Sequence, residues 1–250
     1  MHSPLRTTIP VETLLLAYRS GIFPMADKRE DQDIFWVEPR ERAILPLEDF
    51  HLSKSLRKVV RSDRYIVTMD AAFQDVVEAC AQPRPGHPET WISERIVRSY
   101  VGLHRAGHAH SIECWLPGIE PGATNELVGG LYGVSFERVF CGESMFSRAD
   151  NASKVALAWL VAMMRRAQYR VLDCQFMTDH LASLGAIEMP QAMYMRTLER
   201  AKGRTRMTLM DAYRAFTQEA ETALTQPSSA AASSGASPGK RIAQSLIQTS

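Results

Sequence analysis

The sequence lacks the features that define several large protein classes. It has four cysteines, Cys80, Cys114, Cys141 and Cys174, and no C-x-x-C pair, so neither a disulfide framework nor a zinc ribbon is predicted. Its longest apolar runs, such as residues 156–164, are far shorter than the ~20 residues that a membrane-spanning helix needs. We therefore expect no membrane segment.

Positive and negative charges are also nearly equal in number. The chain of 250 residues has 29 Lys and Arg against 28 Asp and Glu, which excludes a histone-like or a highly acidic protein. The amino terminus has neither the length nor the cleavage site of a signal peptide. Hydrophobic residues make up 45% of the chain, as in ordinary folded proteins. We expect a cytoplasmic protein.

Motifs for nucleotides, nucleophiles and metals are missing as well. There is no G-x-x-x-x-G-K-[ST] and no strand followed by G-x-G-x-x-G, so neither an ATP nor an NAD site is expected. A G-x-S-x-G elbow is absent, because no second glycine follows Ser144. His104 and His108 have the spacing of two ligands on one helix face, but no H-E-x-x-H motif or cysteine partner accompanies them. We predict no metal site.

The apolar pattern predicts helices and strands in mixed order. Segments with i, i+3 and i+4 spacing predict helices, and they begin near residues 11, 71, 94, 153, 178 and 192. Runs rich in β-branched and aromatic residues predict strands, and they cover 65–69, 110–116, 127–134, 138–141 and 169–172. Several neighbouring strands are of the hairpin type. This order predicts an α/β (α+β layered) fold with a central mixed sheet.

Changes of pattern along the chain predict its organisation. A small N-terminal domain is expected over 1–62, a larger domain over 63–210 and a C-terminal helix over 211–225. The last segment, 226–250, contains seven Ser and five Ala and has too few apolar residues to build a core of its own. It predicts a disordered tail.

Polar side chains gather at the ends of the predicted strands between residues 127 and 185, where enzymes often build their sites. In an extended segment, Asp173 and Gln175 project to the same side, so the carboxylate can orient the amide. Capping of a neighbouring loop is an alternative role for this pair. A Cys174 nucleophile with His180 as its base is a further hypothesis, although their spacing does not force a contact.

Five strings in the sequence resemble those of the leucyl/phenylalanyl-tRNA protein transferases. They are GIFPM (21–25), YVGLHRAGHAHSIECW (100–115), LVGGLYGV (127–134), FCGESMFSRADNASKVAL (140–157) and DCQFMTDHLASLGA (173–186). The resemblance implies a small N-terminal domain followed by an acetyltransferase-like (GNAT-type) domain. It also implies transfer of leucine or phenylalanine, with methionine as a further candidate, from charged tRNA to the N-terminal Lys or Arg of acceptor proteins. Such acceptors are thereby marked for N-end-rule degradation.

The resemblance assigns catalytic roles to three residues. Asp173 and Gln175 match the family's catalytic pair, in which Asp173 orients Gln175 and the Gln175 carbonyl accepts a hydrogen bond from the attacking amine. Glu143 matches a carboxylate that helps to organise the same site. Since the aminoacyl ester already supplies the driving force, no cofactor is implied.

Four apolar residues match positions that bind the charged tRNA end. Trp36 and Trp91 match tryptophans that hold the terminal adenosine, where stacking is worth ~1 to 3 kcal/mol per base. Leu131 and Phe140 match the lining of the pocket for the transferred side chain. Core packing would explain all four residues equally simply. The expected partners are Leu-tRNA, Phe-tRNA and acceptor proteins, with no membrane, and we expect a monomer.

Basic residues are locally in excess. Nine Lys and Arg against four Asp and Glu lie between residues 151 and 206, an excess that could meet tRNA phosphates or cover solvated helix faces. Two rival functions are a CoA-dependent N-acetyltransferase and a non-catalytic tRNA-binding protein. The first needs a glycine-rich turn at a helix N-terminus, and none is evident. The second predicts that function survives replacement of Asp173.

Overall fold

The computed structural model describes residues 8–83, 89–118, 120, 122–225 and 237–247. The strands are β1 (Phe23–Met25), β2 (Phe35–Val37), β3 (Glu41–Leu45), β4 (Ile66–Met69), β5 (Ala109–Leu116), β6 (Glu126–Phe136), β7 (Val139–Ser147), β8 (Val171–Gln175) and β9 (Ile187–Pro190). The helices are α1 (Val11–Arg19), α2 (Lys54–Arg61), α3 (Phe73–Cys80), α4 (Glu94–Arg105), α5 (Ala152–Ala167), α6 (Asp179–Ser183), α7 (Gln191–Ala201), α8 (Leu209–Thr225) and α9 (Pro238–Ile247), with a 3-10 turn at Leu47–Asp49.

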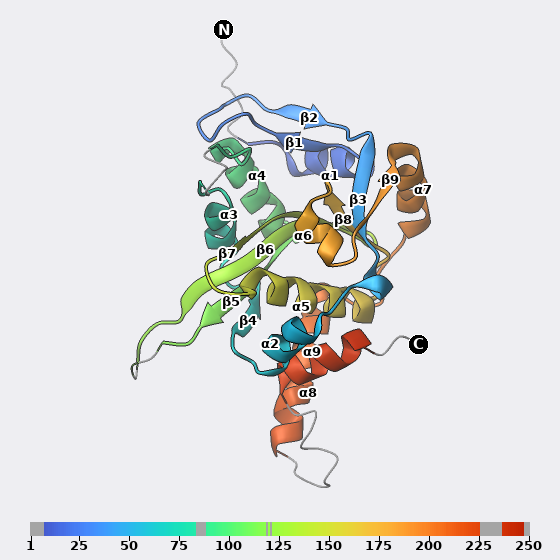
Figure 1. The fold of residues 1–250 in the computed structure, drawn as a ribbon. Coiled ribbons are helices and arrows are strands. Elements are labelled where there is room, and N and C mark those ends of the chain that lie inside the picture. The colour runs from blue at the N-terminus through green and yellow to red at the C-terminus, as the bar shows by residue number, and fades with distance from the viewer. Residues whose placement is uncertain (1–7, 84–88, 119, 121, 226–236, 248–250) are drawn as a thin grey trace.

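A seven-stranded mixed sheet runs through the middle of the molecule. Its strand order is β4-β5-β6-β7-β8-β3-β9, and a separate two-stranded sheet, β1-β2, lies beside it (Figure 1). All neighbours in the large sheet are antiparallel except β7 and β8, which are parallel. These features confirm the predicted fold class, a layered α/β fold with an N-terminal unit and a central mixed sheet.

Helices cover both faces of the large sheet and enclose two hydrophobic cores. One core lies between the sheet and α5, with residues of α2, α8 and α9 packed around that helix. The other lies between the opposite face and α1, α3, α4 and α7. None of the helices within the described ranges is long and apolar enough to cross a membrane.

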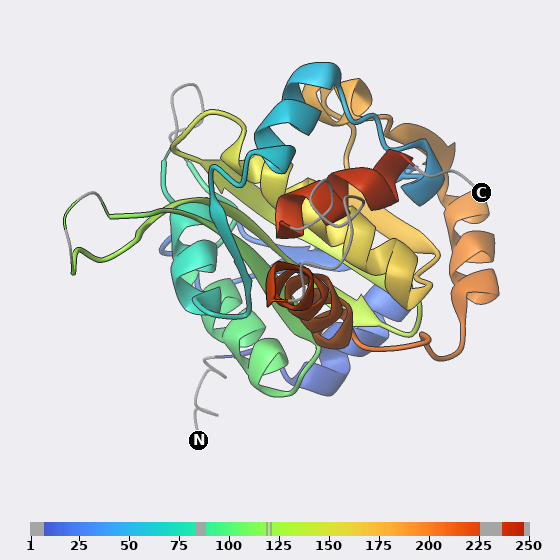
Figure 2. The same ribbon diagram turned by 90° about the horizontal axis from the view of Figure 1, so that it is seen from below.

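Helix α5 is apolar on every side between Val155 and Met164. Thirteen of its 16 residues are buried, so its outer side needs a protein cover as much as its inner side does. Helices α8 and α9 provide that cover, as the view from below shows (Figure 2). The C-terminal segment is therefore part of the folded body.

The prediction of a disordered tail over 226–250 is wrong for residues 237–247, which include α9. Ile242, Ala243 and Leu246 are at most 5% exposed and belong to the core around α5. The overall Ser and Ala content hid a short segment with apolar residues at helical spacing. The serine-rich stretch 226–236 that precedes it lies outside the described residues.

Helix α9 also lies close to α2 and to Asp63, which follows that helix. The Gly239 N–H donates to Asp63 Oδ1 at 2.7 Å. A Cβ atom at Gly239 would lie 2.0 Å from the Val60 carbonyl oxygen, a distance that real side chains do not reach. Only glycine therefore allows the two helices to approach this closely.

The structure places the end of the N-terminal unit earlier than residue 62. That unit contains α1, β1 and β2, whereas β3 already pairs with both β8 and β9 in the large sheet. Helix α2 packs on the core around α5. The change of sequence pattern near residue 62 reflects the start of the edge strand β4. In a sequence, the start of a strand and a domain boundary produce the same change of pattern.

Docking of α9 is testable by replacing Ile242, whose side chain is fully buried. We expect Ile242→Ala to lower the free energy of unfolding by about 2 to 5 kcal/mol, because it removes buried methyl groups and leaves a cavity. Urea unfolding measures the change. Gln244→Ala, on the exposed side of the same helix, is the control and should change stability by less than about 0.5 kcal/mol. Equal stability of both variants would contradict the docked position.

Candidate active site

The site lies where two parallel strands separate. Strands β7 and β8 pair only from Val139 with Val171 to Cys141 with Asp173. Beyond the last pair, Glu143 on β7 and Gln175 on β8 are joined by their side chains, because Gln175 Nε2 donates to Glu143 Oε1 at 3.0 Å. An amide and a carboxylate thus bridge the opening between the strands.

A bulge in β7 places Glu143 in this position. On the neighbouring strand β6, Tyr132 pairs with Ser144 and Gly133 pairs with Gly142, so Glu143 has no partner in the register. An extra residue of this kind turns its side chain away from the regular alternation of a strand. Glu143 consequently lies buried, at 6% exposure.

Asp173 is fully buried and held by four donors. Arg42 on β3 donates from Nε to Oδ1 at 2.9 Å and from Nη2 to Oδ2 at 2.6 Å. The Tyr194 hydroxyl donates to Oδ2 at 2.8 Å, and the Gln175 backbone N–H donates to Oδ1 at 2.9 Å. The Asp173 carboxylate is thus fully occupied, and it orients Gln175 through the backbone of that residue.

Arg42 is the cation at the centre of this arrangement. It is 0% exposed, its Nη1 donates to the Gly21 carbonyl at 3.1 Å, and its guanidinium lies over the rings of Phe23 and Tyr194 at 4.9 and 4.5 Å. Burial disfavours its charge, but the charge of Asp173 and the hydrogen bonds to that carboxylate together outweigh burial and raise the pKa of Arg42 above its usual value.

Gln175 has a left-handed backbone conformation, with φ of +59°. For a residue with a side chain, this conformation costs on the order of 1 to 3 kcal/mol. The bond from its N–H to Asp173 holds it there. The side-chain amide is then aimed at Glu143, and no hydrogen bond found among the described residues uses its carbonyl oxygen Oε1.

Two tyrosines, Tyr100 and Tyr18, lie on the interior side of Glu143. The Tyr100 hydroxyl donates to Glu143 Oε2 at 2.8 Å, and the hydroxyls of Tyr18 and Tyr100 are 2.6 Å apart. Burial raises the pKa of Glu143 to about 7, although the hydroxyls of Tyr100 and Tyr18 act in the opposite direction. A carboxyl group with such a pKa can accept or release a proton near neutral pH.

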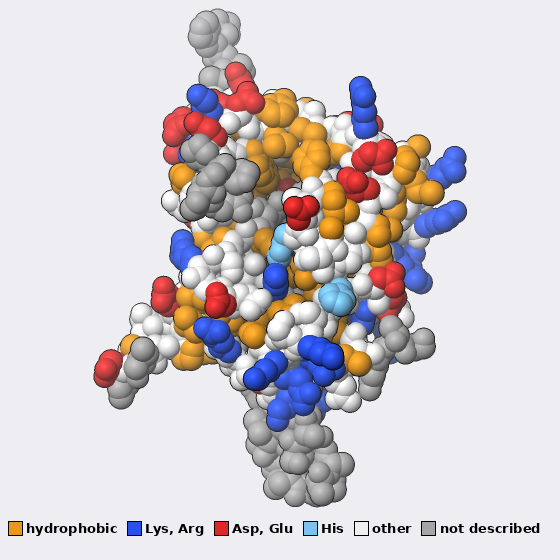
Figure 3. Space-filling model, viewed as in Figure 1, with side chains coloured by type: hydrophobic (Ala, Val, Ile, Leu, Met, Phe, Trp, Pro, Cys, Tyr) orange, Lys and Arg blue, Asp and Glu red, His pale blue; other side chains and the backbone are white. Residues whose placement is uncertain are grey.

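Aromatic side chains surround the outer side of the site. Phe176, directly after Gln175, is 47% exposed and its ring lies edge-on to Phe23 at 5.7 Å. Trp36 is 39% exposed and its backbone pairs with Pro24 of β1. The surface is hollowed between the β1-β2 sheet and α6, with hydrophobic side chains around the hollow (Figure 3).

The other predicted binding residues lie deeper. The carbonyl of Trp91 accepts a bond from Ala26 N at 3.2 Å, just after β1, so both tryptophans neighbour the same strand, and Trp91 is partly buried against the core under α4. Leu131 and Phe140 are 3% and 0% exposed. They belong to the core under α5.

The hypothesis of a Cys174 nucleophile receives no support from the geometry. Burial raises the pKa of the Cys174 thiol well above its usual value, so the reactive thiolate is scarce at neutral pH. Burial and the nearby Lys154 lower the pKa of His180, and no bond between His180 and Cys174 is found. Within the described ranges, no group of three or more His, Cys, Asp or Glu side chains is placed to hold a metal ion.

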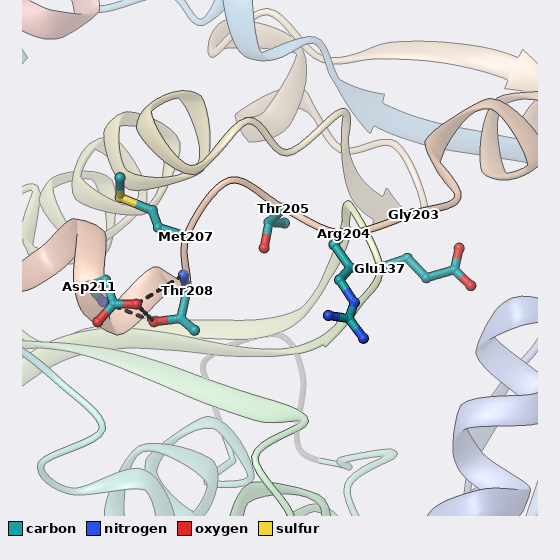
Figure 4. A pocket seen from close by; sticks show the side chains of 7 residues that line it. All are labelled: Glu137, Gly203, Arg204, Thr205, Met207, Thr208 and Asp211. Carbon is teal, nitrogen blue, oxygen red and sulfur yellow. Dashed lines mark hydrogen bonds between the residues drawn. The ribbon is translucent and has the colours of Figure 1, made fainter.

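A cavity of about 570 Å³ lies elsewhere, at the connection between α7 and α8 (Figure 4). Its polar side chains Thr208 and Asp211 bind each other, with Thr208 Oγ1 donating to Asp211 Oδ2 at 2.7 Å and Asp211 N donating to Thr208 Oγ1 at 3.0 Å. This is a helix cap for α8. The cavity shares no residue with the Asp173 and Glu143 networks.

Four residues of the site were not predicted from the sequence: Arg42, Tyr194, Tyr18 and Tyr100. Arg42 follows Glu41 and precedes three apolar residues in the segment ERAIL, and an arginine at such a strand start normally faces water. The tyrosines occupy apolar positions of their helices and look like ordinary core residues. Only long-range contacts distinguish them, so the sequence of one chain carries no local signal for their role.

Comparison with known proteins identifies the family. A family model described as leucyl/phenylalanyl-tRNA protein transferase matches residues 44–199, and one described as the N-terminal domain of that enzyme matches residues 8–40. Proteins named leucyl/phenylalanyl-tRNA--protein transferase are similar in sequence. That of Novosphingobium aromaticivorans is 62% identical over 78% of this chain and 71% of its own. That of Zymomonas mobilis is 54% identical over 75% and 68%.

A more distant relative, from Chlorobaculum tepidum, is 49% identical over 78% of this chain and 97% of its own. Among solved structures, L-PGS from Bacillus licheniformis has a TM-score of 0.32 and 16% identity over 69% of this chain and 55% of that one, a likeness that carries no conclusion. The sequence matches confirm the resemblance. The chain belongs to the leucyl/phenylalanyl-tRNA protein transferase family and is an aminoacyltransferase.

The buried pair of Arg42 and Asp173 generates a stability prediction. We expect Arg42→Met to lower the free energy of unfolding by about 3 to 5 kcal/mol, because Asp173 remains buried without its counter-ion. The double variant Arg42→Met with Asp173→Leu should lose less than the single one, since no uncompensated charge remains. Urea unfolding of both variants measures the difference.

Arg19→Met is the matched control for this experiment. Arg19 is 46% exposed and lies 3.7 Å from Glu137, so loss of this pair should cost less than about 1 kcal/mol. A double variant less stable than Arg42→Met alone would show that the two charges do not depend on each other.

Proposed function

Because the chain belongs to the leucyl/phenylalanyl-tRNA protein transferase family, we propose that it transfers leucine or phenylalanine from aminoacyl-tRNA to the N-terminal Lys or Arg of acceptor proteins. The observation that carries the proposal is the amide and carboxylate pair of Gln175 and Glu143 at the mouth of the separated strands. In the cell, such a transfer would mark acceptors for N-end-rule degradation. Methionine is a further candidate for the transferred residue.

The reaction needs a nucleophile, a proton acceptor and a leaving group. The α-amine of the acceptor attacks the carbonyl carbon of the aminoacyl ester, and a C–N bond forms. The C–O bond to the ribose breaks, and the ribose oxygen leaves as a hydroxyl after it gains a proton. The amine loses one proton in exchange, so a base near neutral pH accelerates the step. The ester supplies the driving force, so we propose that no cofactor takes part.

Glu143 is suited to accept the amine proton, because its pKa of about 7 lies close to that of an α-amino group, ~7.7 to 8.0. Gln175 is bound to Glu143 through Nε2, so its Oε1 can accept a hydrogen bond from the same amine and hold it in line. Asp173 acts through the backbone of Gln175. In this scheme, Glu143 and Gln175 touch the substrate and Asp173 positions Gln175.

Aromatic residues around the hollow are proposed to bind the adenosine at the tRNA end. Trp36 presents an exposed face, and Phe176 lies beside the catalytic Gln175, so base stacking between such rings is physically favourable. Trp91 is proposed as a second support. Leu131 and Phe140 are proposed to line the pocket for the transferred side chain, with the half-buried Met145, which pairs with Leu131, at its accessible end.

A basic face over α2 is proposed to bind tRNA phosphates. It consists of Lys54, Arg57, Lys58 and Arg61, and no ion pair within the described ranges uses them. Lys and Arg side chains gather on the same face as the hollow, in the region of α2 (Figure 3).

Residues 151–206 contribute less to this face than their charge excess predicts. Arg165 is partly buried, and its Nε donates to the Leu47 carbonyl at 2.8 Å. Arg166 is paired with Glu219. These guanidinium groups are committed to the fold, which makes α2 the better candidate for phosphate contacts.

We propose that the protein works as a monomer in the cytoplasm, with charged tRNA and acceptor proteins as its partners and no membrane. The hollow and the basic face lie on one side of a single chain (Figure 3). Both substrates can therefore be bound without a second copy.

The proposed reaction is tested by mixing the protein with radiolabelled Leu-tRNA and a peptide that begins with Arg. We expect label in this peptide and none in a matched peptide that begins with Gly. Glu143→Gln should reduce the transfer rate by about 10² to 10⁴-fold while tRNA binding is kept, because it removes the proton acceptor. Asp173→Ala is less informative, since it leaves Arg42 buried without a counter-ion.

The same experiment separates the rival functions. Absence of transfer by wild-type protein that binds tRNA would favour a non-catalytic tRNA-binding protein. Acetylation of the peptide by acetyl-CoA would favour an N-acetyltransferase. Equal labelling of both peptides would refute selection of the acceptor residue.

The basic face predicts a salt-dependent affinity for tRNA. We expect the logarithm of the binding constant to fall linearly with the logarithm of the salt concentration. Lys58→Ala and Arg61→Ala should each reduce the slope by about one, because each removes one phosphate contact. Filter binding at several salt concentrations measures the slope. Arg196→Ala, an exposed arginine on α7, is the control, and the same loss in this variant would contradict the role of α2.

A further inference from the structure

Two buried tyrosines from different parts of the chain form a hydrogen-bonded row that ends on Glu143. Tyr18 comes from α1 and Tyr100 from α4, and both are 0% exposed. Their hydroxyls are 2.6 Å apart, and Tyr100 donates its proton to Glu143 Oε2 at 2.8 Å. Since Tyr100 has one proton to donate, its oxygen must accept the proton of Tyr18.

The other groups around Glu143 stabilise its carboxylate anion only weakly, so the two tyrosine hydroxyls have a large influence on its charge. The groups that face it are Tyr18 from α1, Arg42 from β3, Tyr100 from α4, Tyr132 from β6, Cys141 from β7, and Asp173 and Gln175 from β8. Arg42 is engaged by Asp173. Asp173 is itself an anion, and its charge opposes that of Glu143. The tyrosines, Cys141 and Gln175 are neutral, since burial keeps the pKa values of Tyr132 and Cys141 well above their usual values.

The two carboxylate oxygens of Glu143 have different partners. Oε1 is bound by Gln175, which faces the substrate side, and Oε2 is bound by Tyr100, which faces the protein interior. A hydrogen bond between neutral partners strengthens the next bond in the row when donors and acceptors follow one another. Tyr18 therefore favours the Glu143 anion together with Tyr100, and it does so from the segment matched by the N-terminal family domain.

We propose that Tyr18 and Tyr100 are positioning residues that fix Glu143 and set the pH range in which it takes the proton of the acceptor amine. The inference rests on the proposed transfer reaction and adds two residues to it. It also gives the N-terminal domain a part in the chemistry, because Tyr18 comes from that domain.

The test compares pH profiles of transfer in tyrosine variants. Tyr100→Phe removes one hydroxyl and keeps the ring. Loss of its donated bond makes the Glu143 anion harder to form. The acid limb of the pH–rate profile, in which the single-turnover rate rises with pH as Glu143 loses its proton, should therefore move to higher pH by about one unit. This shift corresponds to a tenfold change in the proton affinity of Glu143. Above the shifted limb, the rate should return toward the wild-type plateau.

Tyr18→Phe is the second variant and should shift the same limb in the same direction by a smaller amount, since the Tyr18 hydroxyl favours the Glu143 anion less than the Tyr100 hydroxyl does. Glu143→Gln should abolish this limb. The acceptor peptide is the same in every reaction, so the titration of its own amine contributes equally to all profiles. Leu-tRNA, kept saturating, is the donor throughout.

Tyr169→Phe is the matched control. Tyr169 is also buried and shares a hydroxyl bond of 2.8 Å with Ser135, but it belongs to the core under α5. We expect it to leave the acid limb unchanged. Circular dichroism and urea unfolding confirm that each variant is folded before its profile is read.

The outcomes separate the two proposals. No transfer by the wild-type protein at any pH would overturn the proposed function itself. Transfer by the wild type, with a rate that falls equally at every pH in Tyr100→Phe, would overturn the inference alone and leave Tyr100 a structural residue. A limb that shifts equally in Tyr169→Phe would also overturn it.

Discussion

The buried ion pair of Arg42 and Asp173 is the contact on which the site depends. Through Arg42 it reaches the Gly21 carbonyl and the Phe23 ring of the N-terminal unit, and through Asp173 it reaches Tyr194 of α7 and the backbone of Gln175. Four segments far apart in sequence therefore share one charge pair. Such a pair adds little net stability over apolar side chains, but its directional bonds allow only one arrangement of these segments.

This arrangement changes the role that sequence reasoning gives to Asp173. The expected contact between a carboxylate and an amide side chain exists, but the carboxylate is that of Glu143. Asp173 binds the Gln175 backbone in a left-handed conformation that glutamine rarely adopts. The cost of this conformation, on the order of 1 to 3 kcal/mol, is offset by a neighbouring anion that is itself fixed by Arg42. Strain and charge thus place the amide before any substrate arrives.

The sequence predicts the layered fold, the family and the membership of Asp173, Gln175 and Glu143 in one site. Local spacing was sufficient for the strands β4 to β8 and for the helices other than α2 and α9. Five motifs identified the family. It could not show that Arg42 points inward, because ERAIL has no alternation of polar and apolar residues that would assign Arg42 to one face of the sheet. It could not show the bulge at Glu143, which depends on the register with β6. The end of the chain was missed because the composition of 226–250 averages a serine-rich stretch with the apolar residues of α9.

The carboxylates of Asp173 and Glu143 have different surroundings, and this difference explains why one is suited to a structural role and the other to proton transfer. Asp173 has a guanidinium in bidentate contact, whereas the hydrogen-bonding groups around Glu143, the amide of Gln175 and the hydroxyls of Tyr100 and Tyr18, are neutral. Neutral donors stabilise an anion less than a buried cation does, so burial dominates and the pKa of Glu143 rises to about 7. A permanently paired carboxylate is suited to hold a structure, and an unpaired one near neutrality is suited to exchange a proton. If the arginine lay beside Glu143, neither task could be done, because the proton acceptor would be too weak a base and Gln175 would lose its anchor.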